Sequence, residues 1–267
     1  MPQNPIRYWH SMTTTEAKGL AATDPVVILP LAAIEQHGPH LPLSTDLDIG
    51  LGLLASAFSR LPDDFPAWVL PPQAVGSSGE HLRFDGTLSL APELLSGVIH
   101  EHGMAMARCG VRRLVLSNSH GGNRPALDTA GLRLRADAGL LVVKASYFGF
   151  PRPDGVSLPD AEWRYGLHGG AVETAMMLHL RPDLVRTQEI RDAPSLGQEL
   201  EGDLRRLGLE HEAASFAWLA GDLNASGVVG DARQADAATG QRLVAHYGEV
   251  LADVIRDARA FPLNRLI

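Results

Sequence analysis

Two carboxylates and two imidazoles crowd into residues 34–46, whose sequence is IEQHGPHLPLSTD. This segment directly follows the apolar run Val26–Leu29, which is short and β-branched and predicts a strand buried on both faces. Residues 34–46 should therefore begin at the carboxyl end of that strand. Because side chains two apart on an extended backbone project to the same side, Glu35 and His37 can aim at a common point while Gln36 faces away. Such a pair could bind a metal ion.

Asp46 adds the second carboxylate of this segment. It follows a proline-flanked loop and precedes the apolar-periodic segment Leu47–Leu61, with Ser44 or Thr45 available as a helix cap. A carboxylate at this position lies in the first turn of the predicted helix. Carboxylate oxygens mixed with imidazole nitrogens suit a divalent ion such as Zn or Mn without any thiolate. The alternative is a solvated loop with incidental His and Glu, but so many ligand-type residues between one strand and one helix favour metal binding.

A second polar segment, SNSHGGN, follows an apolar strand predicted at Arg112–Leu116 and precedes a helix predicted at Pro125–Ala136. His120 therefore also lies at a strand end. Gly121 and Gly122 would let the backbone approach a ligand closely, but their spacing matches neither the dinucleotide-binding nor the P-loop motif. The pattern favours His120 as a metal ligand over a phosphate-binding loop.

A third segment, HGGAVET at residues 168–174, leads into an apolar helix predicted at Ala175–Leu180. Glu173 falls in the first turns of that helix, where the helix dipole favours a carboxylate. Taken alone, His168 is an ordinary loop histidine and Glu173 an ordinary N-terminal carboxylate. A role in a site requires the fold to bring them to the other two segments.

Two longer loops hold further candidates. The segment Gly76–Thr87 carries Glu80 and His81, which suit an exposed loop as well as a substrate-binding site. The segment Gly149–Gly166 contains Trp163 and is long enough to form a wall or a lid over a site.

Strands and helices alternate along most of the chain. Further strands are predicted at Trp68–Leu70 and Leu140–Ser146, further helices at Pro92–Arg108, Gln198–Leu209 and Thr239–Ala260, and a loop at 221–238. Such alternation predicts β-α-β units, and hence an α/β fold with a mostly parallel sheet covered on both faces. Binding crevices of these sheets lie beyond the carboxyl ends of the strands, so the three polar segments should converge there.

The composition is that of a globular protein with a sizeable core. The chain has 267 residues, of which 45% are hydrophobic and 20% charged, and without a visible linker it is expected to form a single domain over residues 1–267. A net charge of −8 without a basic block argues against nucleic acids and anionic membranes, so a small-molecule partner is expected. Met1–Leu20 lacks the apolar core of a secretory signal and no run reaches membrane-spanning length, so we expect a cytoplasmic location. Cys109 is the only cysteine, which excludes an intrachain disulfide and a thiolate metal cluster.

The spaced motifs resemble those of the creatininase (creatinine amidohydrolase) family. Its pattern Glu-x-His-Gly-x-His-Leu-Pro-x-x-x-Asp matches residues 35–46, Asn-x-His-Gly-Gly-Asn matches 118–123 and His-x-Gly-x-x-Glu-Thr matches 168–174. A looser feature, Ser-x-Glu-His-x-x-Phe-x-Gly-Thr, matches 78–87. Several motifs in the same order make the resemblance specific.

The resemblance implies a three-layer α/β/α sandwich, a two-metal centre, hydrolysis of a non-peptide or cyclic amide C–N bond, and a homo-oligomer, commonly a hexamer. The metal ligands that it implies are Glu35, His37, Asp46 and His120. Creatinine-hydrolysing members place another ligating Glu two residues after the loop histidine, where this chain has Gly122. Glu173 is the nearest candidate to replace it. This departure argues against creatinine itself, and the family also includes formamide deformylases of pyrimidine intermediates and peptidase-like members.

Together these residues lead to a hydrolytic hypothesis. Asp46 bridges two divalent ions, for which Zn is expected and Mn or Fe are alternatives; one ion also takes Glu35 and His120, the other His37 and Glu173. A water shared by the two ions becomes hydroxide near neutral pH and attacks the amide carbon.

Other residues of the loops would serve the substrate. A metal or the Gly169 and Gly170 amides stabilise the oxyanion, and His168 donates a proton to the departing nitrogen. Trp163 helps to set how open the pocket is. The competing interpretation is a non-catalytic protein that binds a metal or a small molecule, which a loss of ligands would favour.

Overall fold

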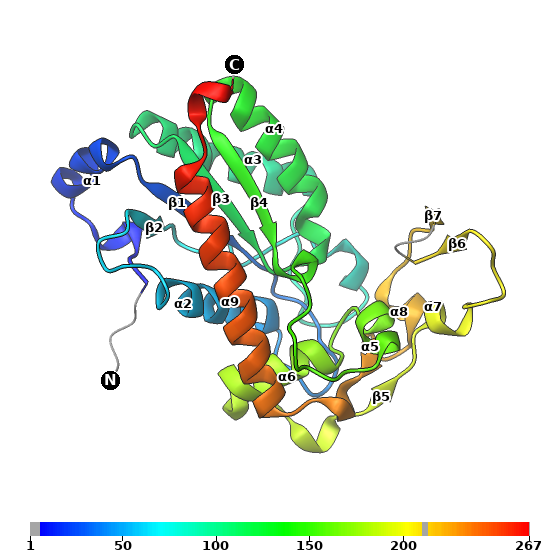
Figure 1. The fold of residues 1–267 in the computed structure, drawn as a ribbon. Coiled ribbons are helices and arrows are strands. Elements are labelled where there is room, and N and C mark those ends of the chain that lie inside the picture. The colour runs from blue at the N-terminus through cyan, green and yellow to red at the C-terminus, as the bar shows by residue number, and fades with distance from the viewer. Residues whose placement is uncertain (1–5, 210–212, 267) are drawn as a thin grey trace.

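The computed structural model describes residues 6–209 and 213–266, and a four-stranded parallel sheet lies at its centre (Figure 1). The strands are β1 (Val26–Leu31), β2 (Ala67–Val69), β3 (Arg113–Asn118) and β4 (Leu141–Ser146), in the order β2-β1-β3-β4. Every neighbouring pair is parallel; Val26 lies opposite Arg113, which lies opposite Leu141. The carboxyl ends of β1, β3 and β4 therefore share one edge of the sheet.

Helices cover both faces of this sheet. The longer ones are α2 (Thr45–Phe58), α3 (Pro92–Arg108), α4 (Arg124–Ala138), α6 (Ala171–Leu180) and α9 (Ala237–Ala260). Val26, Ile28 and Val115 pack against α2, α6 and α9, whereas Val27 and Leu29 pack against α3 and α4. Figure 1 shows α9 running along its face of the sheet. Because β1 is buried on both sides, its sequence is a continuous apolar run, and the result is a three-layer α/β/α sandwich.

Shorter elements lie outside the sandwich. They are α1 (Thr14–Leu20), α5 (Asp160–Tyr165), α7 (Leu196–Glu199), α8 (Ala220–Leu223), the antiparallel pair β5 (Asp192–Ala193) and β8 (Gly230–Asp231), and the pair β6 (Leu207–Gly208) and β7 (Ala214–Ser215). Short 3-10 helices lie at Trp9–Ser11, Ala21–Thr23, Gly79–His81, Gly121–Asn123, Tyr147–Gly149, Pro182–Leu184, Thr187–Glu189, Ala232–Gln234 and Leu263–Arg265. Helices α5, α7 and α8 gather to one side of the sheet (Figure 1), where a separate apolar cluster includes Tyr165, Leu209 and Leu223.

The predicted strands and helices of the sandwich are confirmed, with ends shifted by a few residues. The predicted helix Gln198–Leu209 is wrong: helix α7 ends at Glu199, and residues 201–207 are exposed, so no layer packs against them. Gly202 there has a φ of 90°, a left-handed conformation that a helix cannot continue. The predicted loops Gly149–Gly166 and 221–238 contain α5 and β8.

Across residues 6–209 and 213–266, no helix is both long and apolar enough to span a membrane. Of the N-terminal segment Met1–Leu20, residues 1–5 lie outside the described part of the chain. Its end forms α1, which begins with a capping box between Thr13 and Glu16.

Candidate metal centre and active site

Segments far apart in the sequence meet at the carboxyl edge of the sheet. Glu35 follows β1, Asp46 lies in the first turn of α2, and His120 follows β3. His120 Nδ1 lies 3.2 Å from Glu35 Oε1 and 3.2 Å from Asp46 Oδ2. All three side chains are buried, and together they form a first group that could hold a metal ion.

Asp46 also belongs to a second such group, with His37 and Glu173. His37 Nε2 lies 3.3 Å from Asp46 Oδ1 and 3.8 Å from Glu173 Oε2. Asp46 thus turns one oxygen toward each group, as a carboxylate does when it bridges two ions. Glu173 lies in the first turn of α6, so the third polar segment reaches the same place.

The donor atoms of these groups fit divalent ions. Both oxygens of Glu35, Nε2 of His37 and Oδ2 of Asp46 are buried and have no hydrogen-bond partner within the described chain. Buried carboxylate oxygens in that state are costly unless a cation lies beside them. In the metal-free protein, burial opposes the protonation of His37, yet Asp46, Glu173 and Glu35 raise its pKa to about 9. The carboxylates thus attract positive charge, which two divalent ions would supply.

The rings of His37 and His120 are oriented as metal-binding imidazoles usually are. His37 donates Nδ1–H to the Glu35 carbonyl at 3.1 Å, and His120 donates Nε2–H to the Ser77 carbonyl at 2.9 Å. A ring nitrogen that faces a carbonyl must carry a proton, so the other nitrogen is the one that would bind a metal once the metal displaces the proton that the carboxylates favour there. The backbone therefore selects the tautomer that can bind a metal.

His168 follows the same rule. Its Nε2–H donates to the backbone carbonyl of Gln36 at 2.6 Å, and its Nδ1 lies 3.6 Å from Glu35 Oε1. Its ring lies between His37 and His81, with centroids 4.1 and 4.2 Å away. Burial and the rings of His37 and His81 hold the pKa of His168 well below its usual range. His168 is thus a neutral imidazole with a lone pair aimed into the site.

Both carboxylate oxygens of Glu173 are held by neighbours. The Tyr147 hydroxyl donates to Oε1 at 3.2 Å and the Gly169 amide donates to Oε2 at 2.7 Å. The Gly169 N–H is therefore already used. This bond competes with the expected role of the Gly169 amide in stabilising an oxyanion. The sequence did not reveal that Glu173, four residues later, would accept from this amide.

Tyr147 is a site residue that the sequence patterns missed. It follows β4 and is buried. Its burial, together with the neighbouring Glu173 carboxylate, raises the pKa of Tyr147 well above the usual range. The available signal was its position, because side chains after a parallel strand lie at the binding edge of the sheet.

Glu162 of α5 was missed as well. Its buried carboxylate accepts hydrogen bonds from the Ala171 amide at 2.6 Å and the Asp231 amide at 2.7 Å. A Cβ atom would collide with Glu162 Oε1 at any of the three glycines that enclose it, Gly166, Gly170 and Gly230. Gly170, expected to bind substrate, thus leaves room for this carboxylate. No sequence pattern singles out an isolated Glu in a long loop.

The second imidazole of the 34–46 segment, His40, belongs to none of the groups of described residues that could hold a metal ion, the third of which joins Glu35, His37 and His168. Its Nε2 lies 3.1 Å from the Gly169 carbonyl and 2.9 Å from Thr174 Oγ1. His40 thus ties the loop before α6 to the loop after β1 and positions the residues between them.

Of the other residues predicted to bind substrate, Glu80 and His81 lie beside the metal groups, whereas Trp163 lies against Arg152. His81 Nε2 lies 3.5 Å from Glu35 Oε1, and Glu80 Oε1 lies 3.8 Å from His120 Nε2, so both border the metal groups. Burial lowers the pKa of His81 to about 4, which keeps the ring neutral. Trp163 is half-buried and stacks with the Arg152 guanidinium, 5.1 Å from its ring centroid.

Gly122 is enclosed by the site. A Cβ atom there would overlap the Ser77 carbonyl and approach His120 Nε2 to 2.6 Å and Glu80 Oε1 to 2.8 Å. A glutamate at this position would require the Ser77 backbone to move. The structure around Gly122 thus leaves no room for the glutamate ligand that creatinine-hydrolysing members are expected to carry there.

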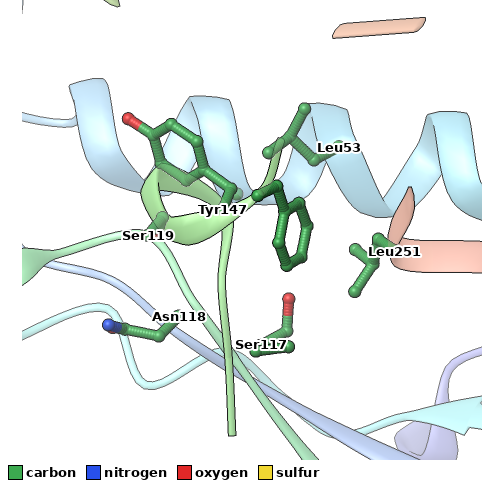
Figure 2. Close-up of a pocket in the computed structure, with 9 residues that line it drawn as sticks. Leu53, Ser117, Asn118, Ser119, Tyr147 and Leu251 are labelled. Atoms are coloured by element: carbon green, nitrogen blue, oxygen red, sulfur yellow. The ribbon is translucent and has the colours of Figure 1, made fainter. Parts of the chain in front are cut away.

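A small cavity lies behind Tyr147 (Figure 2). Its volume is about 10 Å³, enough for one water, and it is bordered by Ser117, Ser119, Leu53 and Leu251. Figure 2 shows the Tyr147 hydroxyl directed away from Ser117 and Leu251, which agrees with its bond to Glu173.

Comparison with known proteins agrees with this geometry. Residues 10–255 match the family described as creatininase, creatinine amidohydrolase. A mycofactocin precursor peptide peptidase of Mycobacterium ulcerans is 36% identical over 93% of this chain and 91% of its own length. A creatinine amidohydrolase of Pseudomonas putida is 36% identical over 66% of this chain and 72% of its own length.

Solved creatininase structures share the fold. One described as creatininase with Mn has a TM-score of 0.71 at 28% identity and covers 94% of this chain and 98% of its own. One described as a mutant creatininase of the Zn-Zn type has a TM-score of 0.72 at 28% identity and covers 94% of this chain and 97% of its own.

Proposed function

Because this chain belongs to the creatininase family, we propose that it is a metal-dependent hydrolase that cleaves an amide C–N bond of a peptide-derived substrate. The observation that carries the proposal is Asp46, whose two oxygens face two separate groups of metal-binding atoms. Glu35 and His120 would hold one ion, His37 and Glu173 the other, and Zn or Mn would serve, as in the family structures.

Two observations support a peptide over the non-peptide or cyclic amides expected from the sequence. A relative that spans almost the whole chain is called a mycofactocin precursor peptide peptidase. Gly122 stands where creatinine-hydrolysing members are expected to carry a Glu, and the Ser77 carbonyl leaves no room for one. The creatinine amidohydrolase relative supports a small cyclic amide as the second candidate.

The residues around the metal groups suit hydrolysis. When bound, a pair of such ions lowers the pKa of a shared water and polarises the amide carbonyl. His168 offers a lone pair at Nδ1, so it can take a proton from the attacking water and deliver it to the departing nitrogen. His40 and Tyr147 keep the Gly169–Glu173 loop in place during these transfers.

Elemental analysis and a substrate panel test the proposal. We expect about two ions per chain, and hydrolysis of short peptides that a strong chelator abolishes and Zn or Mn restores. Creatinine and formylated aminopyrimidines complete the panel, and mass spectrometry identifies the bond that is cleaved. A chain without metal after metal-replete expression, or activity that resists the chelator, would disprove the mechanism; bound metal without any hydrolysis would favour a binding protein.

A matched pair of variants controls for folding. Asp46→Asn should remove both ions. Asp48→Asn, two residues later in α2, should keep them, because Asp48 pairs with Arg181 instead of facing the metal groups.

A further inference from the structure

The side-chain amide of Gln36 has a fixed orientation. Its Oε1 accepts the Gly38 amide at 2.9 Å, and its Nε2 donates to the Gly227 carbonyl at 2.8 Å. A backbone N–H on one side and a carbonyl on the other identify which end of the amide is oxygen and which is nitrogen. The second N–H of Nε2 then remains for another acceptor.

That acceptor is His81. Gln36 Nε2 lies 2.8 Å from His81 Nδ1, which must therefore be the bare nitrogen of the ring. Gln36 Nε2 also lies 3.2 Å from His168 Nε2. That ring nitrogen already donates its proton to the backbone carbonyl of Gln36, so it cannot accept a hydrogen bond. The proton of a neutral His81 is thus on Nε2.

His81 consequently differs from the other imidazoles of the site. His37, His120 and His168 each donate from one ring nitrogen to a backbone carbonyl and turn the other nitrogen, the one that can offer a lone pair, inward. His81 turns its N–H inward, toward Glu35 Oε1 at 3.5 Å. This separation is longer than a usual N–H···O hydrogen bond, so Glu35 leaves the Nε2–H of His81 available to another acceptor.

The Gly169 amide cannot serve as such a donor, because it is occupied by Glu173. On the basis of the proposed hydrolase function, we propose that His81 is a catalytic hydrogen-bond donor whose Nε2–H stabilises the negative charge that develops on the scissile carbonyl oxygen. Gln36 is the positioning residue that fixes the tautomer of His81. The proton stays on His81 throughout, so no bond to Nε2 forms or breaks.

The first test compares His81→Leu with His81→Gln in the metal-loaded enzyme. Glutamine can place a neutral N–H near the position of the His81 Nε2 proton, whereas leucine cannot. Loss of such a donor typically costs 10²–10³-fold in kcat, so we expect that loss for His81→Leu and recovery to within about tenfold for His81→Gln. Metal content should be unchanged in both variants.

Three outcomes would overturn the proposal: full activity of His81→Leu, equal loss in both variants, or a loss of metal, which would make His81 a ligand. If the wild-type protein hydrolyses no member of the panel, the proposed function fails. If it hydrolyses one and His81→Leu does so equally well, only the role of His81 fails.

The second test measures the tautomer itself in Zn-loaded protein with ¹⁵N-labelled histidine. We expect magic-angle-spinning NMR to show His81 protonated at Nε2 in the wild type, with the signals assigned by their disappearance in His81→Gln. In Gln36→Glu a carboxylate oxygen faces Nδ1, so the proton should move there and kcat should fall while Zn is retained. A wild-type ring protonated at Nδ1, or a Gln36→Glu protein with a moved proton and unchanged kcat, would contradict the proposal.

Discussion

Glu173 and His168 lie in one loop, and the proposed function gives them different roles, although His168 also lies with Glu35 and His37 in a group that could hold a metal ion. Glu173 borders His37 and Asp46 in a metal group, so Glu173→Gln should weaken binding at that group and lower metal content together with turnover. His168→Ala should keep both ions and lower kcat by about 10²–10⁴-fold, the usual contribution of a proton-transfer residue. Elemental analysis beside kcat measurement separates the two. Full metal in Glu173→Gln with a lost ion in His168→Ala would mean that their roles are exchanged.

Tyr147 acts through Glu173, since its hydroxyl holds Oε1 in place. Tyr147→Phe should therefore weaken metal binding by about 10–100-fold, as losses of groups that orient a ligand usually do. Competition with a chromophoric chelator measures this change. Tyr247→Phe is the control, because its ring lies 5.7 Å from that of Tyr147 but does not contact Glu173. Equal affinities in the two variants would refute the role of Tyr147.

The residues of the site were predictable where their backbone position alone decides their direction. Glu35, His37 and His120 follow strands of a parallel sheet, so alternation and strand order bring them together. The hydrogen bonds that the Gly169 amide and the Tyr147 hydroxyl donate to Glu173 depend instead on side-chain contacts across the fold. Those contacts have no periodicity and leave no mark in the sequence.

Among the elements, α6 and α9 pack so closely that only glycine fits at one point of their contact. A Cβ atom at Gly240 of α9 would overlap the Ala175 carbonyl of α6. Gly240→Ala should lower the free energy of unfolding by about 2 kcal/mol or more, because rigid backbone must move. Gly97→Ala in α3, where nothing lies within 4 Å of the new methyl group, should instead raise it by up to about 1 kcal/mol. Urea denaturation compares the two, and a shift in the same direction for both would contradict this account.

At the same scale, the alternation of apolar strands and amphipathic helices was sufficient to predict the sandwich. The segment 198–209 was not predictable in this way, because its helical spacing has no layer to pack against. Tertiary burial, and not periodicity, decides whether such a segment becomes a helix.

For the molecule as a whole, metal binding should be the largest reversible contribution to stability. Each ion present at about 100 times its Kd stabilises by about 2.7 kcal/mol, so removal of both by a chelator should lower Tm by about 10–20 °C in a chain of this size. Differential scanning calorimetry tests this, with the Asp48→Asn protein as a control that responds equally. An unchanged Tm would mean that the buried carboxylates do not hold metal.

The metal-free protein should also depend on pH in a defined direction. The folded pKa of His37, about 9, lies above its unfolded value near 6.5. The stability that its protonation supplies is therefore full below pH 6.5 and is lost as the pH rises through 9, by on the order of 3 kcal/mol. His37→Gln should flatten the curve measured by urea denaturation between pH 6.5 and 9; an unchanged slope would contradict the assignment.

A homo-oligomer, and in particular a hexamer, stays a prediction from the family resemblance. Light scattering at micromolar concentration should report about six times the chain mass of 28.6 kDa. A monomer would show that this chain assembles differently from what its resemblance suggests.

The carboxylate of Glu162, enclosed by three glycines, also bears on how this site can change over generations. None of those glycines can acquire a side chain while Glu162 remains, and loss of Glu162 would leave the Ala171 and Asp231 amides without their acceptor. A substitution at one of these positions should therefore be tolerated only when another of them changes as well. Helix α5, the loop before α6 and the Gly230 turn should therefore change together or not at all.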